Sequence, residues 1–254
     1  MGFRQLFKQS ITKAYWWNAR ANFGDALAPL LLSRFAYLET QWSAIEQASI
    51  ASIGSILDQI PAGWRGHIVG SGRLREKAEL MFDPTEAKIL ALRGPLSARG
   101  IHGTYGLGDP GLLANELIDA QEKKWDLGIV PHWLDKELVG RFQKLIPSKF
   151  SCKVISPATD PLTVLKEISA CKRVVTSSLH GMICADAFGI PRRVETCDRM
   201  NSEGGLFKFH DYSASIKCKL EIGKMMEPKR SNIDDVRFEI WDAYRELGRA
   251  YGKG

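Results

Sequence analysis

Short β-rich runs alternate with amphipathic stretches along most of this chain, and this alternation restricts the fold more than any other feature of the sequence. Several of these runs are almost continuously apolar, which is typical of strands buried on both faces of a parallel sheet. The repeated order of strand and helix predicts an α/β protein with mainly parallel sheets and right-handed crossovers. The predicted strands are Lys13–Trp17, His67–Gly70, Lys88–Leu92, Trp125–Val130, Lys153–Ile155 and Lys172–Thr176, and the predicted helices are Ala26–Phe35, Leu112–Ala120, Leu134–Leu145, Pro161–Cys171 and Gly181–Phe188.

The length of 254 residues suits one large α/β domain or two compact lobes of ordinary domain size. The polar stretch Gln121–Lys124 is the best candidate hinge, which divides the chain into residues 1–120 and 121–231. A last helix is expected over residues 232–254, with Asn232 as its N-cap, and we expect it to pack back on the N-terminal part. Its apolar stripe consists of Ile233, Val236, Ile240, Tyr244, Leu247 and Tyr251.

The net charge of +6 favours anionic partners without choosing among phosphates, carboxylates, acidic lipids and nucleic acid. Aromatic residues are scattered and form no patch with basic residues, so a nucleic-acid-binding function is rejected.

No apolar window approaches the roughly 18 residues of a spanning helix, and no signal peptide is visible, so we expect a cytoplasmic protein. Phe3, Leu6 and Phe7 alternate with Arg4 and Lys8, which indicates either peripheral contact with the inner face of the membrane or a frayed end.

Distinctive residues follow the carboxyl ends of five predicted strands. In open parallel sheets ligands bind at this edge, because loops and helix N-termini converge there. We therefore expect the functional site at these strand ends. The five runs are Asn22–Asp25, Gly70–Gly72, Arg93–Pro95, Pro131–His132 and Ser177–Gly181.

The run Ser177-Ser-Leu-His-Gly181 leads from a Val-Val-Thr strand into a helix, which places His180 and neighbouring backbone N–H groups at a helix start. The unsatisfied donors and the positive end of the helix dipole favour a phosphate or a carboxylate at this point. An imidazole with its ordinary pKa near 6.5 can supply a proton near neutral pH. The alternative is that His180 only caps or packs at the turn.

Other strand-end residues each allow a functional and a structural interpretation. The guanidinium of Arg93 suits a bidentate contact with a carboxylate or phosphate, although a lone arginine at a strand end is more often in a surface ion pair. Asp25 is either a base or the N-cap of the helix that follows it. Gly70-Ser-Gly72 permits close approach of the backbone to a ligand or simply a tight turn, and His132 is equally open.

Several familiar sites are absent from the sequence. Gly70-Ser-Gly72 lacks the third glycine of a dinucleotide-binding fingerprint, and there is no Walker A lysine, G-x-S-x-G elbow or H-E-x-x-H helix. We therefore expect neither a cofactor nor a metal ion.

Seven motifs in their order along the chain resemble the polysaccharide pyruvyltransferase family, especially its short ketal-pyruvate transferases of xanthan-type and succinoglycan-type exopolysaccharide synthesis. The resemblance covers nearly the whole chain. It implies two Rossmann-like lobes arranged as in GT-B glycosyltransferases, with the active site in the interlobe cleft. The motifs are Asn22–Leu27, Gly70–Gly72, Leu92–Pro95, Gly108–Leu113, Ile129–His132, Ser177–Gly181 with Ala185–Pro191, and Lys208–Tyr212.

The resemblance implies transfer of the enolpyruvyl unit of phosphoenolpyruvate to two hydroxyls of a sugar, on a glycan acceptor that is a lipid-linked oligosaccharide. His180, Arg93 and Asp25 are the implied catalytic residues. Ser178 stands where some relatives have an arginine, so a second cation must come from Arg73, Arg192, Arg193 or Lys208. The implied substrate-binding residues are Asn22, Gly24, Gly70, Ser71, Gly72, His132, Ser177, Ser178, Leu179, Gly181 and Lys208.

Two other function classes compete with this interpretation. A glycosyltransferase of similar architecture would need contacts to a nucleobase and a ribose, which the sequence does not reveal. A noncatalytic carbohydrate-binding module would not need His180 and Arg93 to converge on a small anion pocket.

Overall fold

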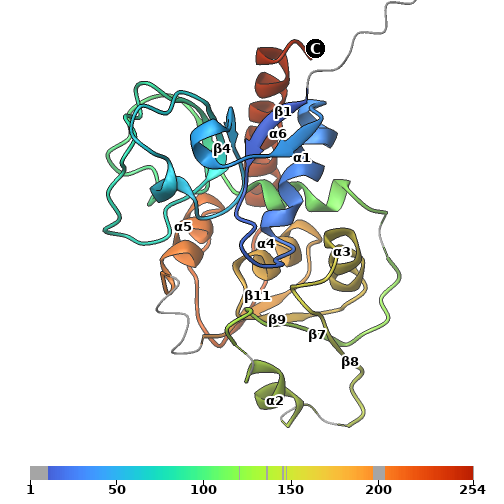
Figure 1. The fold of residues 1–254 in the computed structure, drawn as a ribbon. Coiled ribbons are helices and arrows are strands. Elements are labelled where there is room, and N and C mark those ends of the chain that lie inside the picture. Colours follow the sequence, from blue (N-terminus) through green and yellow to red (C-terminus); the bar gives the residue numbers. More distant parts are fainter. Residues whose placement is uncertain are drawn as a thin grey trace, which may run out of the picture.

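A computed structural model describes residues 11–119, 121–135, 137–144, 146, 148–196 and 204–253 of the chain. Two mainly parallel sheets with accompanying helices make up the fold, which confirms the predicted α/β class. The first sheet forms the upper part of Figure 1 and the second sheet the lower part.

The first sheet has six strands in the order β2-β1-β3-β4-β5-β6, and each neighbouring pair is parallel. Helix α1 (Ala28–Ala36) packs against the terminal helix α6 (Arg230–Ala250), which also contacts β4, β5 and β6 (Figure 1). The strands are β1 (Thr12–Tyr15), β2 (Thr40–Trp42), β3 (Ile50–Ala51), β4 (His67–Ser71), β5 (Lys88–Leu92) and β6 (Gly106–Leu107), with short 3-10 helices η1 (Asp25–Leu27), η2 (Ile45–Gln47) and η3 (Leu57–Gln59) between them.

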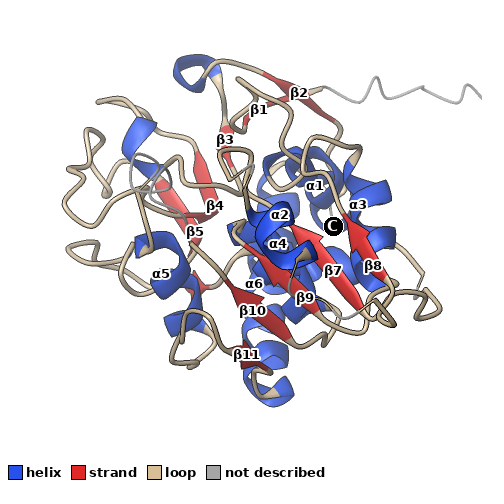
Figure 2. Ribbon diagram, turned by 90° about the horizontal axis from the view of Figure 1, so that it is seen from below, coloured by secondary structure: helices blue, strands red, loops and turns tan. Residues whose placement is uncertain are grey.

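The second sheet has five strands in the order β11-β10-β9-β7-β8, and only the β10–β11 pair is antiparallel. Helix α3 packs on α4, and α4 packs on β9 and β10 (Figure 2). The strands are β7 (Leu127–Val130), β8 (Cys152–Val154), β9 (Val174–Thr176), β10 (Arg192–Val194) and β11 (Met225–Met226), and the helices are α2 (Leu138–Gln143), α3 (Pro161–Ser169), α4 (Leu179–Ala187) and α5 (Phe207–Ser215).

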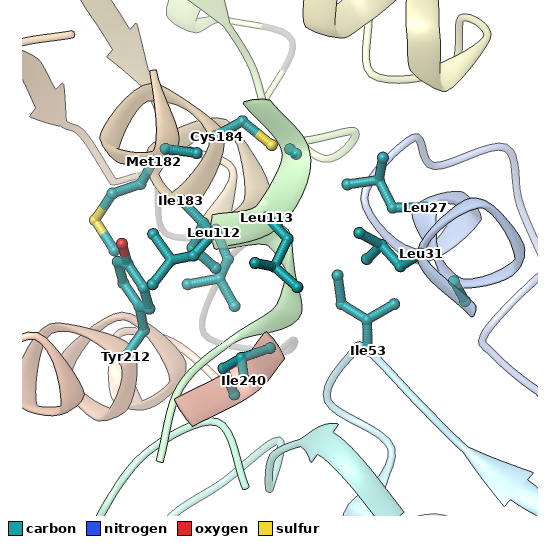
Figure 3. Close-up of a cluster of buried hydrophobic side chains, with 14 of the residues drawn as sticks. Leu27, Leu31, Ile53, Leu112, Leu113, Met182, Ile183, Cys184, Tyr212 and Ile240 are labelled. Carbon is teal, nitrogen blue, oxygen red and sulfur yellow. The ribbon is translucent and has the colours of Figure 1, made fainter. Parts of the chain in front are cut away.

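One hydrophobic core runs between the two sheets. The 3-10 helix η4 (Pro110–Glu116) carries Leu112 and Leu113 into this core, between α4 and the side chains of Leu27 and Leu31 (Figure 3). Helix α4 is buried along its whole length, because η4 covers one side of it and the second sheet covers another. This packing fixes the position of the first turn of α4 relative to the first sheet.

Local sequence explains several of the predicted elements. The side chain of Asp160 caps α3 by accepting a hydrogen bond of 2.9 Å from the backbone N–H of Thr163, and Pro161 occupies the first turn, where its missing N–H is not needed. In α6 the predicted stripe from Ile233 to Leu247 is buried, as expected for an amphipathic helix that packs on a sheet.

One predicted α-helix has another helix type in the structure, and one predicted N-cap is wrong. The segment predicted as an α-helix over Leu112–Ala120 is instead the 3-10 helix η4, which begins at Pro110 with Asp109 as its N-cap. Residue 120 lies outside the described residues. The last helix begins at Arg230 with Lys229 as its N-cap, and the side chain of Asn232 instead donates a hydrogen bond to the carbonyl of Ile216.

Among the described residues, five short strands and one α-helix were not predicted, nor were the 3-10 helices η2 and η3; the strands are β2, β3, β6, β10 and β11, and the α-helix is α5. Runs of two or three residues are too short to carry a period-2 pattern, and α5 alternates apolar and polar side chains without a clear stripe.

No helix among the described residues is long and apolar enough to span a bilayer. The amphipathic start from Phe3 to Lys8 lies outside the described residues. The segment Gln121–Lys124 connects η4 to β7, and its role as a hinge stays a prediction.

Candidate active site

A pocket of about 120 Å³ opens where strand ends of both sheets meet. From the first sheet it takes residues that follow β1, β3 and β4, and from the second sheet residues that follow β7 and β9. Helix α5 adds Lys208. The lining residues are Trp17, Asn22, Asp25, Ser55, Ile56, Gln59, Leu74, His132, Trp133, Ser178, Leu179, His180 and Lys208.

Half of the residues predicted for the site line this pocket. They are Asn22, Asp25, His132, Ser178, Leu179, His180 and Lys208. The other predicted residues do not line it, and they are Gly24, Gly70, Ser71, Gly72, Arg93, Ser177 and Gly181.

His180 lies in the first turn of α4, as the sequence predicted, and its side chain is only 7% exposed. Ser178 caps this helix by accepting a hydrogen bond of 3.4 Å from the backbone N–H of Gly181. The ring of Phe23 meets the imidazole edge to face, and a Cβ atom added at Gly24 would overlap Nδ1 of the imidazole. Glycine at position 24 is therefore what allows the ring to sit against the η1 turn.

Burial lowers the pKa of His180 to about 3, and the positive charges of Lys208 and Arg93 lower it further in the same direction. The imidazole of His180 thus departs from the ordinary pKa near 6.5 on which the sequence-based expectation of a proton donor rested. A bound anion would act in the opposite direction, because a negative charge within a few ångströms stabilises the imidazolium.

Asp109 is a buried acid beside His180 whose role sequence reasoning missed. Its Oδ1 atom lies 4.0 Å from Nε2 of His180 and accepts a hydrogen bond of 2.8 Å from the backbone N–H of Gly111. Both Oδ2 of Asp109 and Nε2 of His180 are buried without a hydrogen-bond partner. Burial raises the pKa of Asp109 to about 7, so its carboxyl group holds a proton for much of the time near neutral pH.

Asp25 faces the pocket from η1 and is 6% exposed. It does not cap the following helix with its side chain; its carboxylate instead accepts a hydrogen bond from the side-chain amide of Asn22. Burial raises the pKa of Asp25 to about 7, while the nearby positive charge of Lys208 opposes this rise. Near neutral pH, the protonated and the ionised forms of Asp25 are therefore both populated.

His132 and Lys208 complete the polar lining. The backbone N–H of His132 donates a hydrogen bond of 2.9 Å to Ser177 Oγ, so Ser177 supports the pocket from behind. Burial lowers the pKa of His132 to about 4, with a further contribution from Lys208. Lys208 itself is 8% exposed, which brings a cation into a largely desolvated site.

Arg93 lies behind the pocket with a fully buried side chain. Its Nε donates to Asp211 at 2.9 Å, and its terminal nitrogens donate to Ser55 Oγ at 2.7 Å and to the carbonyl of Arg73 at 2.6 Å. Ser55 lines the pocket, so Arg93 reaches it through this serine and also anchors α5 through Asp211. The implied catalytic role of Arg93 stays a prediction.

The four candidates for a second cation differ in their partners and in whether they line the pocket. Arg73 donates to the backbone carbonyls of Ala78, Ser97 and Arg99; Arg192 is paired with Asp186, and Arg193 with Glu195. Among these four residues, only Lys208 lines the pocket.

The Gly70–Gly72 turn also lies behind the pocket. Gly70 has a φ of 79° and packs so closely on Pro110 that a Cβ atom would overlap the proline ring. Ser71 donates a hydrogen bond to the carbonyl of Ser52, and a Cβ at Gly72 would overlap the guanidinium of Arg93. These residues hold the strand ends together.

Six lining residues were missed by sequence reasoning. Trp17 and Trp133 adjoin predicted strand ends, and their position was the signal that could have found them. The guanidinium of Arg20 lies 4.4 Å from the ring centre of Trp133. The others, Ser55, Ile56, Gln59 and Leu74, depend on the short strand β3 and on the loop after β4.

The fold and the pocket define an α/β protein with a partly buried, cation-containing site at the carboxyl ends of its strands. Residues 60–198, which are more than half of the chain, match the family model of polysaccharide pyruvyl transferase. The chain therefore belongs to the polysaccharide pyruvyl transferase family, and the resemblance described from its motifs is confirmed.

Two relatives add detail to this assignment. The chain is 29% identical over 215 residues to the succinoglycan biosynthesis protein ExoV of Rhizobium meliloti (strain 1021), which covers 80% of this chain and 64% of ExoV. It is 38% identical over 112 residues to the uncharacterized protein L143 of Acanthamoeba polyphaga mimivirus, which covers 42% of this chain and 38% of L143. The chain thus spans less than two thirds of the length of either relative.

Proposed function

We propose that this protein transfers the enolpyruvyl unit of phosphoenolpyruvate to two hydroxyls of one sugar in a polysaccharide repeat unit, which closes a cyclic ketal and releases phosphate. The observation that carries this proposal is the convergence of His180, Asp25 and Lys208 on one small, largely desolvated pocket. Membership of the polysaccharide pyruvyl transferase family supports the same reaction class.

Phosphoenolpyruvate presents a phosphate and a carboxylate to the protein. Lys208 supplies a cation in the pocket, and the first turn of α4 supplies backbone N–H groups at the positive end of a helix dipole. Both interactions strengthen where water is excluded, because the local dielectric constant is low. The anion would in turn raise the pKa of His180 toward the range in which it can act as an acid.

The reaction begins with protonation of the methylene carbon of phosphoenolpyruvate by His180, which makes the adjacent carbon an electrophile. One sugar hydroxyl attacks this carbon, phosphate leaves, and the second hydroxyl closes the ketal. Asp25 and His132 are the bases available to the hydroxyls. The protons balance: of the two hydroxyl protons, one replaces the proton given to the new methyl group and the other departs with phosphate.

The lobe arrangement is part of this proposal. Residues 1–120 and the terminal helix 232–254 would form one Rossmann-like lobe and residues 121–231 the other, in a GT-B-like pair with the site in the cleft between them. The lining of the pocket by strand ends of both sheets supports this arrangement, as does the packing of α6 on the first sheet.

The acceptor and the location of the protein are also proposals. The printed name of ExoV places that relative in succinoglycan biosynthesis, which supports a glycan acceptor for this chain. We propose a lipid-linked oligosaccharide at the inner face of the cell membrane, with the protein in the cytoplasm or in peripheral contact with that face. The donor carries its own activated group, so the reaction requires no cofactor.

A thermal-shift comparison tests the donor. Phosphoenolpyruvate at a hundred times its dissociation constant should stabilise the fold by about 2.7 kcal/mol, whereas nucleotide sugars and free glycans should leave the melting temperature unchanged. Mass spectrometry of a lipid-linked oligosaccharide incubated with phosphoenolpyruvate and protein should then show the added pyruvyl ketal. Stabilisation by a nucleotide sugar alone would favour a glycosyltransferase, and stabilisation by glycans alone a carbohydrate-binding module.

Replacing Lys208 with methionine should weaken the binding of phosphoenolpyruvate by about ten- to a hundredfold, because a hydrogen bond to a charged group contributes about 1.5 to 3 kcal/mol. Isothermal titration measures this change directly. Lys224→Met is the control, since Lys224 is exposed and paired with Glu221 outside the pocket. Equal affinity of Lys208→Met and the unaltered protein would remove Lys208 from the anion site.

A further inference from the structure

We propose that Asp109 is the buried proton partner of His180: it passes a proton to Nε2 while Nδ1 gives one to the substrate. This inference rests on the proposed function and adds a positioning residue to it. Its basis is geometric: Nε2 of His180 and Oδ2 of Asp109 are both buried without a hydrogen-bond partner, and Oδ1 of the same carboxyl group lies 4.0 Å from Nε2.

The two side chains are held close together by separate parts of the fold. Asp109 lies at the N-cap of η4, where the backbone N–H of Gly111 fixes its Oδ1, and its side chain is 0% exposed. His180 lies in the first turn of α4, which packs directly on η4. The separation of 4.0 Å between Oδ1 and Nε2 is about 1 Å longer than a hydrogen bond. A small movement of the ring would close it.

The orientation of the ring assigns different tasks to its two nitrogens. Nε2 points inward toward Asp109 and is buried. Nδ1 lies against Gly24, which stands in the sequence between the pocket-lining residues Asn22 and Asp25. A proton held at Nδ1 is therefore the one that can reach a substrate in the pocket, and a group at Nε2 can influence it only through the ring.

Unpartnered polar atoms are costly inside proteins, and each one calls for an explanation. A carboxylate behind an imidazole supplies that explanation, because it fixes the tautomer and stabilises the imidazolium during proton transfer. The raised pKa of Asp109, about 7, and the lowered pKa of His180, about 3, agree with a resting state in which the proton is on the carboxyl group.

The proton balance of the step is closed. Asp109 O–H gives its proton to Nε2 of the Nδ1–H tautomer, which forms an imidazolium beside a carboxylate. The Nδ1 proton then moves to the methylene carbon of phosphoenolpyruvate, which leaves the Nε2–H tautomer hydrogen-bonded to Asp109. A hydroxyl proton of the acceptor restores the starting state at the end of the cycle.

Other charged and titratable groups surround the pair and contribute to its pH dependence. Lys208 and Arg93 act on His180, and Arg93 also stabilises the ionised form of Asp109. Groups on four elements and one strand end interact electrostatically with Asp109, so that its charge or theirs affects the pKa of the other. They are Asp25 of η1, Arg93 after β5, Cys184 of α4, Asp211 and Tyr212 of α5, and Tyr244 of α6.

The test compares Asp109→Asn, which keeps the shape and the acceptor for Gly111 N–H, with the unaltered full-length protein. We expect kcat to fall about a hundredfold while KM for phosphoenolpyruvate changes less than about twofold, since proton transfer by a positioned group contributes about 10²- to 10⁴-fold. The decrease in kcat on the alkaline side of the pH profile, where Asp109 loses its proton, should disappear. An unchanged kcat, or an unchanged alkaline limb, would overturn the proposal.

Asp186→Asn is the matched control, because Asp186 is also a buried carboxyl group, in the last turn of α4, but is paired with Arg192 and Tyr212. It should lower the melting temperature and leave the shape of the pH profile unaltered. A loss of the alkaline limb in this variant as well would assign the effect to general destabilisation and contradict the proposal.

A second measurement does not depend on turnover. Nitrogen-15 spectra of the histidine rings, with His180 assigned by His180→Gln, should show Nε2 of His180 gaining a proton when phosphoenolpyruvate is added without acceptor. In Asp109→Asn this change should be absent. The same change in both proteins would overturn the role of Asp109, whereas no binding of phosphoenolpyruvate to the unaltered protein would overturn the proposed function instead.

Discussion

Replacing His180 with glutamine should lower kcat for pyruvyl transfer by about 10²- to 10⁴-fold, the range that general acid catalysis contributes. The amide fills part of the space of the ring but cannot protonate a carbon atom. KM for phosphoenolpyruvate should change much less, because Lys208 and the first turn of α4 remain in place. Phosphate release measured against phosphoenolpyruvate concentration separates the two constants.

His67→Gln is the control for this substitution. His67 is a half-buried histidine on β4 whose pKa is also lowered by burial, but it contacts Tyr251 and does not line the pocket. Its replacement should leave kcat unchanged. Turnover by His180→Gln at the rate of the unaltered protein would assign His180 a packing role at the helix start, the alternative that the sequence left open.

The sequence predicted the position of a site residue correctly where a local pattern determines it. An apolar strand followed by Ser177-Ser-Leu-His-Gly181 predicts a capped helix start, and the structure has this start with Ser178 as the cap. The parallel sheets and the buried stripe of α6 were equally readable, because both follow from hydrophobic periodicity.

Long-range packing was not readable in the same way. The guanidinium of Arg93 is buried because Asp211, 118 residues later in the sequence, returns to it on the unpredicted helix α5. Without that helix, neither the burial of Arg93 nor the entry of Lys208 into the pocket can be deduced. The motif that contains both Lys208 and Asp211 was recognised. The sequence did not show that Lys208 lines the pocket whereas Asp211 holds Arg93 behind it.

Protonation states were the least predictable property. The pKa of a side chain depends on its burial and on the charges around it, which no local pattern reveals. The pKa values of His180 and His132 are lowered, and those of Asp25 and Asp109 are raised. In each case burial is the largest cause. Ordinary pKa values are therefore not a sufficient basis for assigning the acid and the base of this pocket from the sequence.

Gly24→Ala should reduce kcat about a hundredfold, the cost expected when a catalytic group is displaced by about 1 Å. Gly24 has a φ of −63° and a ψ of −49°, which alanine adopts without strain, so the backbone itself is not the reason. The reason is steric, because the added methyl group would overlap Nδ1, Cγ and Cβ of His180. The imidazole must move away from the position in which it faces both the pocket and Asp109.

A matched substitution and a double variant distinguish this mechanism from a general loss of stability. Gly140→Ala places a methyl group on α2 with no heavy atom within 4 Å, so kcat should not change. If Gly24 acts only through the imidazole, the double variant Gly24→Ala/His180→Gln should be no slower than His180→Gln alone, since residues that act as one unit are not additive. Additive losses would show that Gly24 contributes separately, and that the position of the ring is not what this glycine protects.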